Sequence, residues 1–255
     1  MRMTGNTILI TGGGSGIGRE LARRFHDRGN TVIVTGRRRE ALDETADGRP
    51  NIHATTLDVT DPQDIAAFAA RITAEHPALN VLINNAGIMR YEAIDRARDL
   101  SDAEETVTAN LLGPIRMTDA LVEHLSRQPD AAVVNVSSGL AFVPLVAAPT
   151  YSATKAAVHS YTVSLREALK GRVEVIELAP PAVQTELTPG QSTRAAYLPL
   201  DAFMEEVMAL FAQAPTPREI LVQLVAFQRN AEAEHRFDEA VTTLNDLARR
   251  AREGQ

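Results

Sequence analysis

The stretch TILITGGGSGIG, residues 7–18, passes from a short apolar run into a glycine-rich turn, and residues 19–28 continue it with an amphipathic helical pattern. Glycine lets the backbone turn sharply and approach a bound pyrophosphate closely, while the N-terminus of the following helix offers free N–H groups. The spacing Gly12-x-x-x-Gly16-x-Gly18 differs from the Gly-x-Gly-x-x-Gly fingerprint, and such a turn also occurs as a purely structural feature. The turn therefore predicts a strand–helix unit and a candidate nucleotide site that needs support from elsewhere.

Further short apolar runs alternate with helical segments through the first two-thirds of the chain. With the first run included, they cover residues 7–10, 31–34, 53–57, 81–83, 131–136 and 173–178. Nearly continuous apolar runs are typical of strands buried on both faces of a parallel sheet, and strand–helix alternation indicates βαβ units. We therefore predict an α/β fold, a doubly wound parallel β-sheet of about six strands flanked by helices, with its ligand crevice at the carboxyl ends of the strands.

The last third of the chain departs from this alternation. From Asp201 onward, apolar residues recur at helical spacing, and Thr216-Pro217 has the proline typical of a first helical turn. A seventh strand is not expected there. We predict one domain in two parts: a dinucleotide-binding and catalytic part over residues 1–190, and a substrate lid with a helical C-terminal extension over residues 191–255.

Composition excludes several classes of protein. The chain has 255 residues, 44% of them hydrophobic, and a formal net charge of −7, which fits a globular domain and argues against nucleic-acid binding. It has no cysteine, so disulfides and thiolate catalysis are excluded, and its six histidines are scattered, so we predict no metal. No apolar run approaches the about 20 residues of a membrane span, and no secretory leader is evident, so we expect a cytoplasmic protein without membrane contact.

The end of the second predicted strand bears on the choice of nucleotide. An NAD site prefers an acidic residue there, to bind the ribose hydroxyls, whereas this chain has Gly36-Arg37-Arg38. Guanidinium groups suit a 2′-phosphate. The alternative for each arginine alone is a solvated, basic start to the next helix. As a unit, the sequence favours NADP(H), with NAD(H) as the second candidate cofactor.

The strongest chemical signal lies around Tyr151 and Lys155. The two residues are four positions apart in a helical pattern, so they share one face, and Ser138 follows a predicted strand. A free phenol has a pKa of about 10, too high for efficient proton exchange near neutrality, and an adjacent ammonium lowers it. A single Tyr-x-x-x-Lys is common on helix surfaces. In combination with the serine and the glycine-rich turn, it indicates acid–base chemistry at a carbonyl or alcohol.

Together these motifs resemble the short-chain dehydrogenase/reductase superfamily. The resemblance covers roughly residues 7–187 and is carried by Thr11-Gly12-x-x-x-Gly16-Ile17-Gly18, Asn84-Asn85-Ala86-Gly87, Asn110, Ser138 and Tyr151-x-x-x-Lys155. It implies a Rossmann-type fold and hydride transfer between a nicotinamide and a carbonyl/alcohol pair. Tyr151 would be the general acid/base, Lys155 would lower its pKa and bind the nicotinamide ribose, and Ser138 would orient the substrate oxygen. Asn110 would hold a water of a proton relay, or else mark a helix kink.

The resemblance also implies cofactor contacts. Asp58 would meet the adenine, although it is equally suited to capping the next helix. Where the family usually has Pro-Gly after the sixth strand, this chain has Pro180-Pro181, and proline lacks an N–H, so the Val183 backbone and the Thr185 hydroxyl are expected to contribute instead. The complete predicted cofactor set is Gly12, Gly14, Ser15, Gly16, Ile17, Gly18, Arg37, Arg38, Asp58, Val59, Asn85, Ala86, Gly87, Tyr151, Lys155, Pro181, Val183 and Thr185.

The Pro-Pro pattern and the C-terminal run to Asn245 are similar to a branch of bacterial DltE-type dehydrogenases. We predict a homodimer, formed through the helices of Asn110 and Tyr151, because the strand that builds many family tetramers is not expected. Substrate identity is expected to depend on the segments 89–91, 140–149 and 189–204. The two longer segments are mostly apolar, which favours a small to medium hydrophobic substrate. Arg90 and Arg194 are interpreted as solvated surface residues, with an acidic substrate group as the alternative partner.

Two other classes of function compete with the oxidoreductase. One is a nucleotide-binding regulator or scaffold without turnover; the presence of Asn110, Ser138, Tyr151 and Lys155 argues against it, because a sensor needs no proton machinery. The other is an interaction protein that uses its helical tail as a partner surface. The apolar positions of the tail are more simply explained as core packing or a substrate lid.

Overall fold

The computed structural model describes residues 1–253, and these contain one parallel sheet of seven strands. The order in the sheet is β3-β2-β1-β4-β5-β6-β7, so β1 lies between β2 and β4. The chain changes direction across the sheet at this point, where doubly wound proteins bind their ligands. The strands are β1 (Thr7–Thr11), β2 (Thr31–Gly36), β3 (Ile52–Thr56), β4 (Leu79–Asn84), β5 (Ala132–Val136), β6 (Glu174–Leu178) and β7 (Glu219–Ile220).

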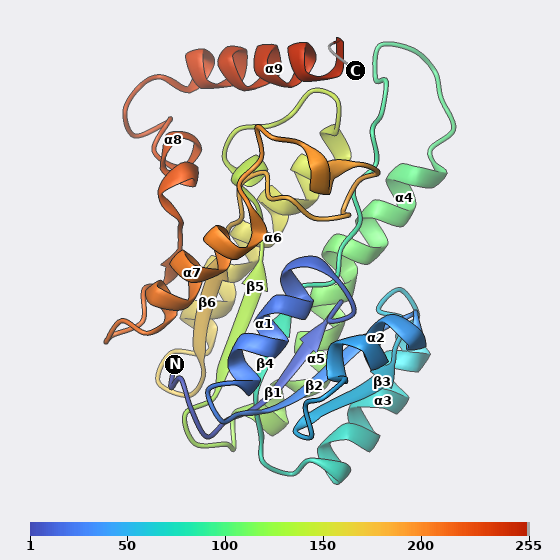
Figure 1. Cartoon of the computed structure of the whole chain (residues 1–255), viewed down its shortest axis with the longest axis vertical. Coiled ribbons are helices and arrows are strands. Elements are labelled where there is room, and N and C mark those ends of the chain that lie inside the picture. The colour runs from blue at the N-terminus through green and yellow to red at the C-terminus, as the bar shows by residue number, and fades with distance from the viewer. Residues whose placement is uncertain (254–255) are drawn as a thin grey trace.

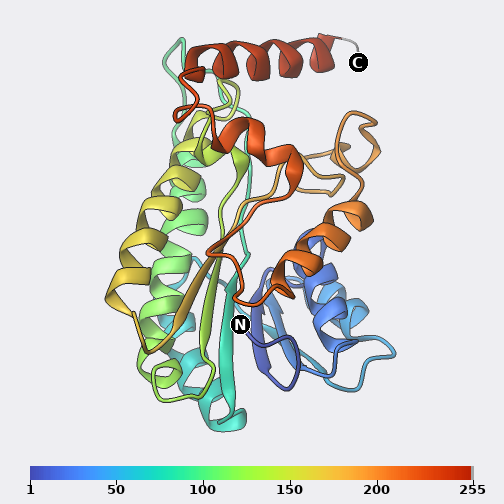
Figure 2. The same ribbon diagram turned by 90° about the vertical axis from the view of Figure 1, so that its left-hand side faces the viewer.

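Helices cover both faces of the sheet (Figures 1 and 2). The first, second and seventh helices pack on one face, and the third, fifth and sixth on the other. The predicted α/β fold is confirmed. The helices are α1 (Gly16–His26), α2 (Arg39–Ala46), α3 (Pro62–Glu75), α4 (Ser101–Val107), α5 (Gly113–Leu125), α6 (Pro149–Ala168), α7 (Leu200–Phe211), α8 (Ala226–Arg229) and α9 (Phe237–Glu253).

The central strands are largely apolar because each contributes to two cores. Ile8 and Ile10 of β1 pack on the face of α1 and α7, whereas Leu9 packs on the face of α3 and α5. All three side chains are completely buried. Successive side chains of a strand point to opposite faces, so a strand covered on both sides has no polar face to show. The two cores hold the sheet rigidly and present the ends of its strands as a fixed platform.

The predicted strand count is corrected by one. Glu219 and Ile220 pair with Glu177 and Leu178 of β6, so a short seventh strand stands where only helix was expected. Thr216-Pro217 accordingly does not begin a helix. A two-residue strand carries no readable periodicity, and it forms because β6 presents open N–H and C=O groups at its edge. The rest of the extension is largely helical, as predicted, in α7, α8 and α9.

The last helix, α9, lies across the carboxyl end of the sheet (Figures 1 and 2). It packs on the segment 140–149: Val143 shares a small core with Ala240, and Asn245 holds the backbone of the segment. The Asn245 amide oxygen accepts from Val146 N at 2.7 Å, and its nitrogen donates to Pro144 O at 3.1 Å. Among residues 1–253, no helix combines the length and apolarity needed to cross a membrane.

Candidate active site

The glycine-rich turn is shaped so tightly that side chains would collide in it. A Cβ on Gly18 would lie 2.3 Å from the Gly12 carbonyl oxygen, and one on Gly12 would lie 2.8 Å from Ala86 Cα. Gly12 and Gly16 also have positive φ angles, +68° and +50°. Glycine is therefore required here both for conformation and for space. The turn delivers the chain into α1, whose first N–H groups face the open end of the sheet.

The turn forms one wall of a cavity of about 480 Å³ at the carboxyl ends of β1, β2, β4 and β5. Every residue of the predicted cofactor set lines this cavity. Its floor is made of glycines and backbone, which permits close approach of a pyrophosphate, and one end is basic while the other holds Tyr151 and Lys155. Both the shape and the donor groups fit a nicotinamide dinucleotide.

The basic end of the cavity lies at the end of β2. Arg37 is largely exposed, and its guanidinium stands 4.0 Å from a carboxylate oxygen of Glu105, a lining residue that the sequence did not indicate. The three residues at the end of β2, Gly36, Arg37 and Arg38, include no acidic side chain. Asp58 also lines the cavity, and one of its carboxylate oxygens accepts from the N–H and hydroxyl of Thr60. Helix α3 is capped by Asp61 instead, so the alternative role for Asp58 is wrong.

The opposite end holds the predicted catalytic groups. Tyr151 and Lys155 lie on α6 with 7% and 4% of their surface exposed, and the lysine Nζ is 5.6 Å from the centre of the tyrosine ring. The Lys155 ammonium donates to Val136 O at 2.8 Å, at the end of β5. Ser138, just beyond that strand end, hydrogen-bonds the Tyr151 phenol and accepts from Leu140 N at 3.1 Å. The structure thus brings phenol, hydroxyl and ammonium together.

Burial governs the protonation of both groups. It raises the pKa of the Tyr151 phenol to about 12, although the hydrogen bond from Ser138 works in the opposite direction. Burial also lowers the pKa of Lys155 to about 8, opposed by the negative charge of Glu177. The expectation that Lys155 lowers the tyrosine pKa is not met by the protein alone, because removal of the phenol from water outweighs the other influences.

Asn110 lies in a π-helical turn, Thr108–Leu112, between α4 and α5. Its side chain is completely buried: the amide oxygen accepts from Ile88 N, and the amide nitrogen donates to Ile88 O, both at 2.8 Å. It does not line the cavity. A Cβ on Gly87 would lie 3.1 Å from the Asn110 oxygen and 3.7 Å from Lys155 Nζ, so the asparagine is next to the site behind Gly87. The helix irregularity that the sequence suggested is present as well.

One lining residue of the segment after β6 escaped the sequence analysis. Gln191 is buried, and its side-chain nitrogen donates to Val183 O at 2.8 Å and to the Thr185 hydroxyl at 3.2 Å. It therefore fixes two residues of the predicted cofactor set. Pro181 lines the cavity where glycine is usual in the family. No local pattern marks Gln191, because its role depends on a loop that folds back onto residues 183–185.

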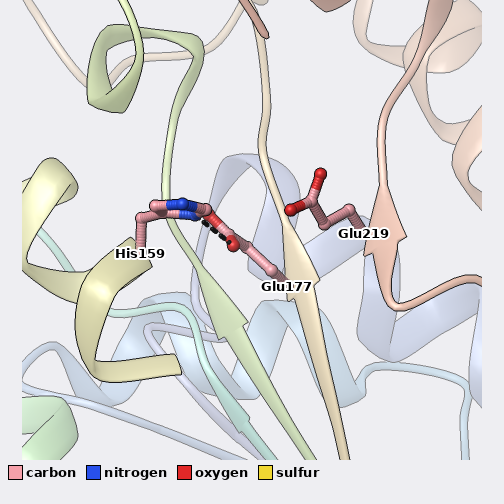
Figure 3. Close-up of side chains that lie close together, drawn as sticks. All are labelled: His159, Glu177 and Glu219. Carbon is pink, nitrogen blue, oxygen red and sulfur yellow. Dashed lines mark hydrogen bonds and ion pairs between the residues drawn. The ribbon is translucent and has the colours of Figure 1, made fainter. Parts of the chain in front are cut away.

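A second group that the sequence did not indicate lies beside α6. The ligand-type atoms of His159, Glu177 and Glu219 lie within 4.8 Å of one another (Figure 3). Their positions in the chain have no metal-site spacing. Arg229 donates to both carboxylate oxygens of Glu219, at 2.8 and 3.1 Å, so this carboxylate is already neutralised. Each carboxylate of this cluster thus has a basic partner within the chain: Arg229 for Glu219 and His159 for Glu177.

The substrate side of the site is apolar. Tyr151 shares a small core with Leu145 and Ala148, against which Met89 and Leu140 pack. Of the two arginines considered for an acidic substrate, Arg90 pairs with Asp102 and Glu105. The other, Arg194, donates to the hydroxyls of Tyr91 and Tyr197 at 3.3 and 3.0 Å. Both arginines have partners within the chain.

Comparison with known proteins places these features in a wider group. The short chain dehydrogenase family model matches residues 6–196. An uncharacterised oxidoreductase, DltE, from Bacillus subtilis (strain 168) is 45% identical to this chain over 190 residues, which are 73% of this chain and 75% of that protein.

Solved structures show the same likeness. A short-chain dehydrogenase from Burkholderia cenocepacia J2315 in complex with NADP superposes with a TM-score of 0.80 and 25% identity, over 96% of this chain and 99% of that one. A 3-ketoacyl-(acyl-carrier-protein) reductase from Brucella melitensis complexed with NADH gives a TM-score of 0.75 and 26% identity, over 84% and 93% of the two chains. Proteins similar to this chain thus bind either nicotinamide nucleotide.

Proposed function

The chain belongs to the short-chain dehydrogenase family, and on that premise we propose that it is an NADP(H)-dependent oxidoreductase with Tyr151 as its general acid/base. Its substrate in this proposal is a small to medium, hydrophobic carbonyl or secondary alcohol. One observation carries the proposal: the Tyr151 phenol, the Ser138 hydroxyl and the Lys155 ammonium are buried together at one end of a glycine-floored cavity. A protein that only binds nucleotides has no use for this arrangement.

The residues of the chain supply everything except the hydride. When bound, the nicotinamide donates or accepts that hydride. The Ser138 hydroxyl orients the substrate oxygen. The Tyr151 hydroxyl gives that oxygen a proton in reduction, and the Tyr151 phenolate takes one from it in oxidation. With its pKa at about 12, the phenol is protonated at neutral pH, so the protein by itself is prepared for the reductive direction. Oxidation requires a lower phenol pKa, and the positive ring of an oxidised nicotinamide has the right charge for that.

Lys155 has two roles in the proposal. Its ammonium, held by Val136 O, binds the ribose hydroxyls of the nicotinamide nucleotide, and its charge favours the phenolate of Tyr151. Asn110 completes the group behind Gly87, where its buried amide ties the chain at Ile88 to the π-helical turn. In this way it fixes the wall against which the lysine lies.

The substrate class follows from the walls of the site. The segment 140–149 and α9 together cover Tyr151 with apolar side chains, and Arg90 and Arg194 are engaged within the chain. An acidic substrate would have to break these pairs, whereas an apolar one gains from burial without doing so. The proposed division of labour along the chain is the one expected above: residues 1–190 bind the cofactor and react, and residues 191–255 cover the substrate.

The proposal extends to assembly as a homodimer through α4, α5 and α6. Val107 on α4 and Val163 on α6 are 37% and 48% exposed, large apolar side chains on the helices expected to form the interface. A second copy that covers these helices would remove them from water.

Fluorescence titrations with NADPH and NADH test the cofactor assignment directly. We expect NADPH to bind about tenfold or more tightly, because the guanidinium of Arg37 meets its 2′-phosphate. Arg37→Ala should weaken NADPH binding and leave NADH binding unchanged, while Arg71→Ala, an exposed arginine on α3, should alter neither. Equal binding of NADPH and NADH would refute the cofactor preference but leave the oxidoreductase function standing. If the protein bound neither nucleotide, both the preference and the proposed function would be refuted, and a scaffold role would be favoured.

A further inference from the structure

A buried carboxylate, that of Glu177 on β6, lies directly behind the catalytic groups. Its side chain is completely inaccessible to solvent. One oxygen accepts from the Ser137 hydroxyl, and the other meets His159 Nδ1 at 2.7 Å (Figure 3). A charge with no access to water is costly unless it is paired and hydrogen-bonded, and here both oxygens are engaged. The proposed mechanism so far makes no use of this group.

Ser137 connects the carboxylate to the site. It stands between Val136, whose carbonyl holds the Lys155 ammonium at 2.8 Å, and Ser138, whose hydroxyl meets the Tyr151 phenol. The Ser137 N–H also donates to Leu178 O at 2.8 Å, so both its backbone and its side chain are bound to β6. A rotation at Ser137 would move the partner of the lysine and the partner of the tyrosine at the same time.

Charged groups reach this place from several elements. Helix α6 contributes His159 and Lys155, β7 contributes Glu219, and α8 contributes Arg229, whose guanidinium binds Glu219 and lies over the Phe142 ring. Arg166 of α6 acts electrostatically on Glu219 from farther along the helix. Arg229 pairs with Glu219, His159 is hydrogen-bonded to Glu177, and Glu177 acts electrostatically on both Lys155 and Arg229.

We propose that Glu177, held by His159 and Ser137, is a positioning residue that fixes the end of β5 beneath Ser138 and contributes a negative charge that acts on the Lys155 ammonium. This inference rests on the proposed function, since it assigns Glu177 a role through Lys155 and Ser138. His159, which is only partly buried, modulates the effect, because its proton cancels the carboxylate charge.

The protonation of the two cations agrees with this arrangement. Burial lowers the pKa of Lys155 to about 8, and Glu177 opposes that decrease. The hydrogen bond to Glu177 raises the pKa of His159 above its usual range. Removal of the carboxylate charge should therefore lower both values, so that each cation loses its proton at a lower pH than in the parent protein.

His159, Glu177 and Glu219 could be taken for a metal site, but each of the four carboxylate oxygens already has a hydrogen-bond donor. The Arg229 fork occupies both oxygens of Glu219, and His159 and Ser137 occupy those of Glu177. A divalent cation would have to displace an arginine that has its own stacking partner in Phe142. The charges balance without an ion, so an internal ion-pair network accounts for the group.

Glu177→Gln tests the proposal, because it keeps the shape and hydrogen-bonding reach of the side chain while removing its charge. Its matched control is Glu174→Gln, the same change at the far, exposed end of β6, where the carboxylate pairs with the N-terminal ammonium. We expect NADPH affinity and kcat to decline with rising pH in all proteins. In Glu177→Gln this decline should begin about 1 pH unit lower than in the parent and the control.

A second pair of measurements keeps the test decisive if the buried substitution impairs folding. Ser137→Ala removes the hydrogen bond to Glu177 but leaves the carboxylate charge in place. It should therefore lower kcat roughly tenfold without moving the pH at which NADPH affinity declines. The His159 ring resonance of the parent, assigned by its loss in His159→Gln, should titrate at a higher pH than a free histidine does.

The outcomes separate the two proposals. If the parent binds NADPH and turns over but Glu177→Gln and Glu174→Gln share one pH profile, the positioning role is wrong and the proposed function stands. A parent that binds neither nucleotide overturns both. Retention of one equivalent of Zn²⁺ by the parent after dialysis, with loss in Glu177→Gln, would replace the ion-pair network by a metal site and overturn the proposal.

Discussion

At the scale of single residues, the site is defined by what burial does to three polar groups. On a surface, water would hold the pKa values of Tyr151 and Lys155 near the usual ones, and the Ser138 hydroxyl would bind water. Beneath the segment 140–149 the phenol pKa rises to about 12 and the lysine pKa decreases to about 8. The tertiary packing that buries Tyr151 and Lys155 is thus also the cause of their shifted pKa values.

Replacement of the phenol tests the acid/base assignment. Tyr151→Phe should lower kcat by a factor of about 10² to 10⁴, the usual contribution of a general acid, and leave NADPH affinity nearly unchanged. The measurement is steady-state turnover with a carbonyl substrate, beside a fluorescence titration with NADPH. Tyr161→Phe, ten residues farther along α6, removes a half-buried hydroxyl outside the cavity and should retain turnover. Full activity in Tyr151→Phe would contradict the mechanism.

Lys155 predicts a pH dependence for cofactor binding. Its pKa is lowered to about 8, so the ammonium is present below that pH and is lost above it. NADPH affinity should therefore decrease as the pH rises through about 8, because the ribose hydroxyls lose a charged partner. Lys155→Ala should bind NADPH weakly at every pH and turn over slowly, whereas exposed Lys170→Ala should follow the parent. An unchanged affinity from pH 6 to pH 10 would exclude a binding role for this ammonium.

At the scale of elements, two segments far apart in the chain form the roof of the site. Helix α9 binds the segment 140–149 through Asn245, whose side chain hydrogen-bonds the backbone of Pro144 and Val146. Around this anchor, Val143 and Ala240 share one small core, and Tyr151 belongs to the next. A helix that holds a loop above a catalytic residue controls the space that a substrate can enter.

Asn245→Ala should loosen this roof. The substitution leaves the Val146 N–H and the Pro144 carbonyl without their side-chain partner, so the segment 140–149 should open more often. We expect KM for the substrate to rise about three- to tenfold at unchanged NADPH affinity, together with faster amide exchange at Val146. The control is Thr242→Ala, one turn earlier on α9, whose hydroxyl bonds only within its own helix. Equal KM values in Asn245→Ala and Thr242→Ala would show that the contact of α9 with the segment 140–149 does not affect substrate binding.

At the scale of the whole molecule, the seven-stranded sheet separates two tasks. Its carboxyl edge holds the cavity, and the helices on the face of α3, α5 and α6 present apolar residues outward, Val163 among them. A rigid platform with one reactive edge leaves its flanking helices free to pair with a second copy.

Light scattering on the purified protein tests the proposed assembly. We expect twice the mass of a 27.6 kDa chain, and Val163→Asp should shift the mass toward one chain because it places a charge in the apolar interface. Leu224→Asp, at an exposed leucine away from α4, α5 and α6, should leave the mass unchanged. A monomeric parent would refute the dimer. A dimer that persists in Val163→Asp would show that the interface does not include Val163.

The sequence alone determined the features that depend on near neighbours in the chain. Apolar runs mark β1 to β6 because a doubly covered strand must be apolar on both faces, and four-residue spacing places Tyr151 and Lys155 on one side of α6. The glycine-rich turn is similarly recognisable from one short stretch of sequence, although most of the residues that crowd it, such as Val34 and Ala86, come from other segments. These features made the fold and the cofactor cavity predictable.

Only the tertiary structure decided what depends on distant partners. The β7 strand exists because β6 offers an open edge, Gln191 acts through a loop that returns to Val183, and α9 covers a segment about a hundred residues earlier. Glu177 lies between His159 and Ser137 only because α6, β5 and β6 pack together. Periodicity and spacing report the neighbours of a residue along the chain; they carry no information on which side chains meet when separate elements pack, and that packing sets the charges around Lys155.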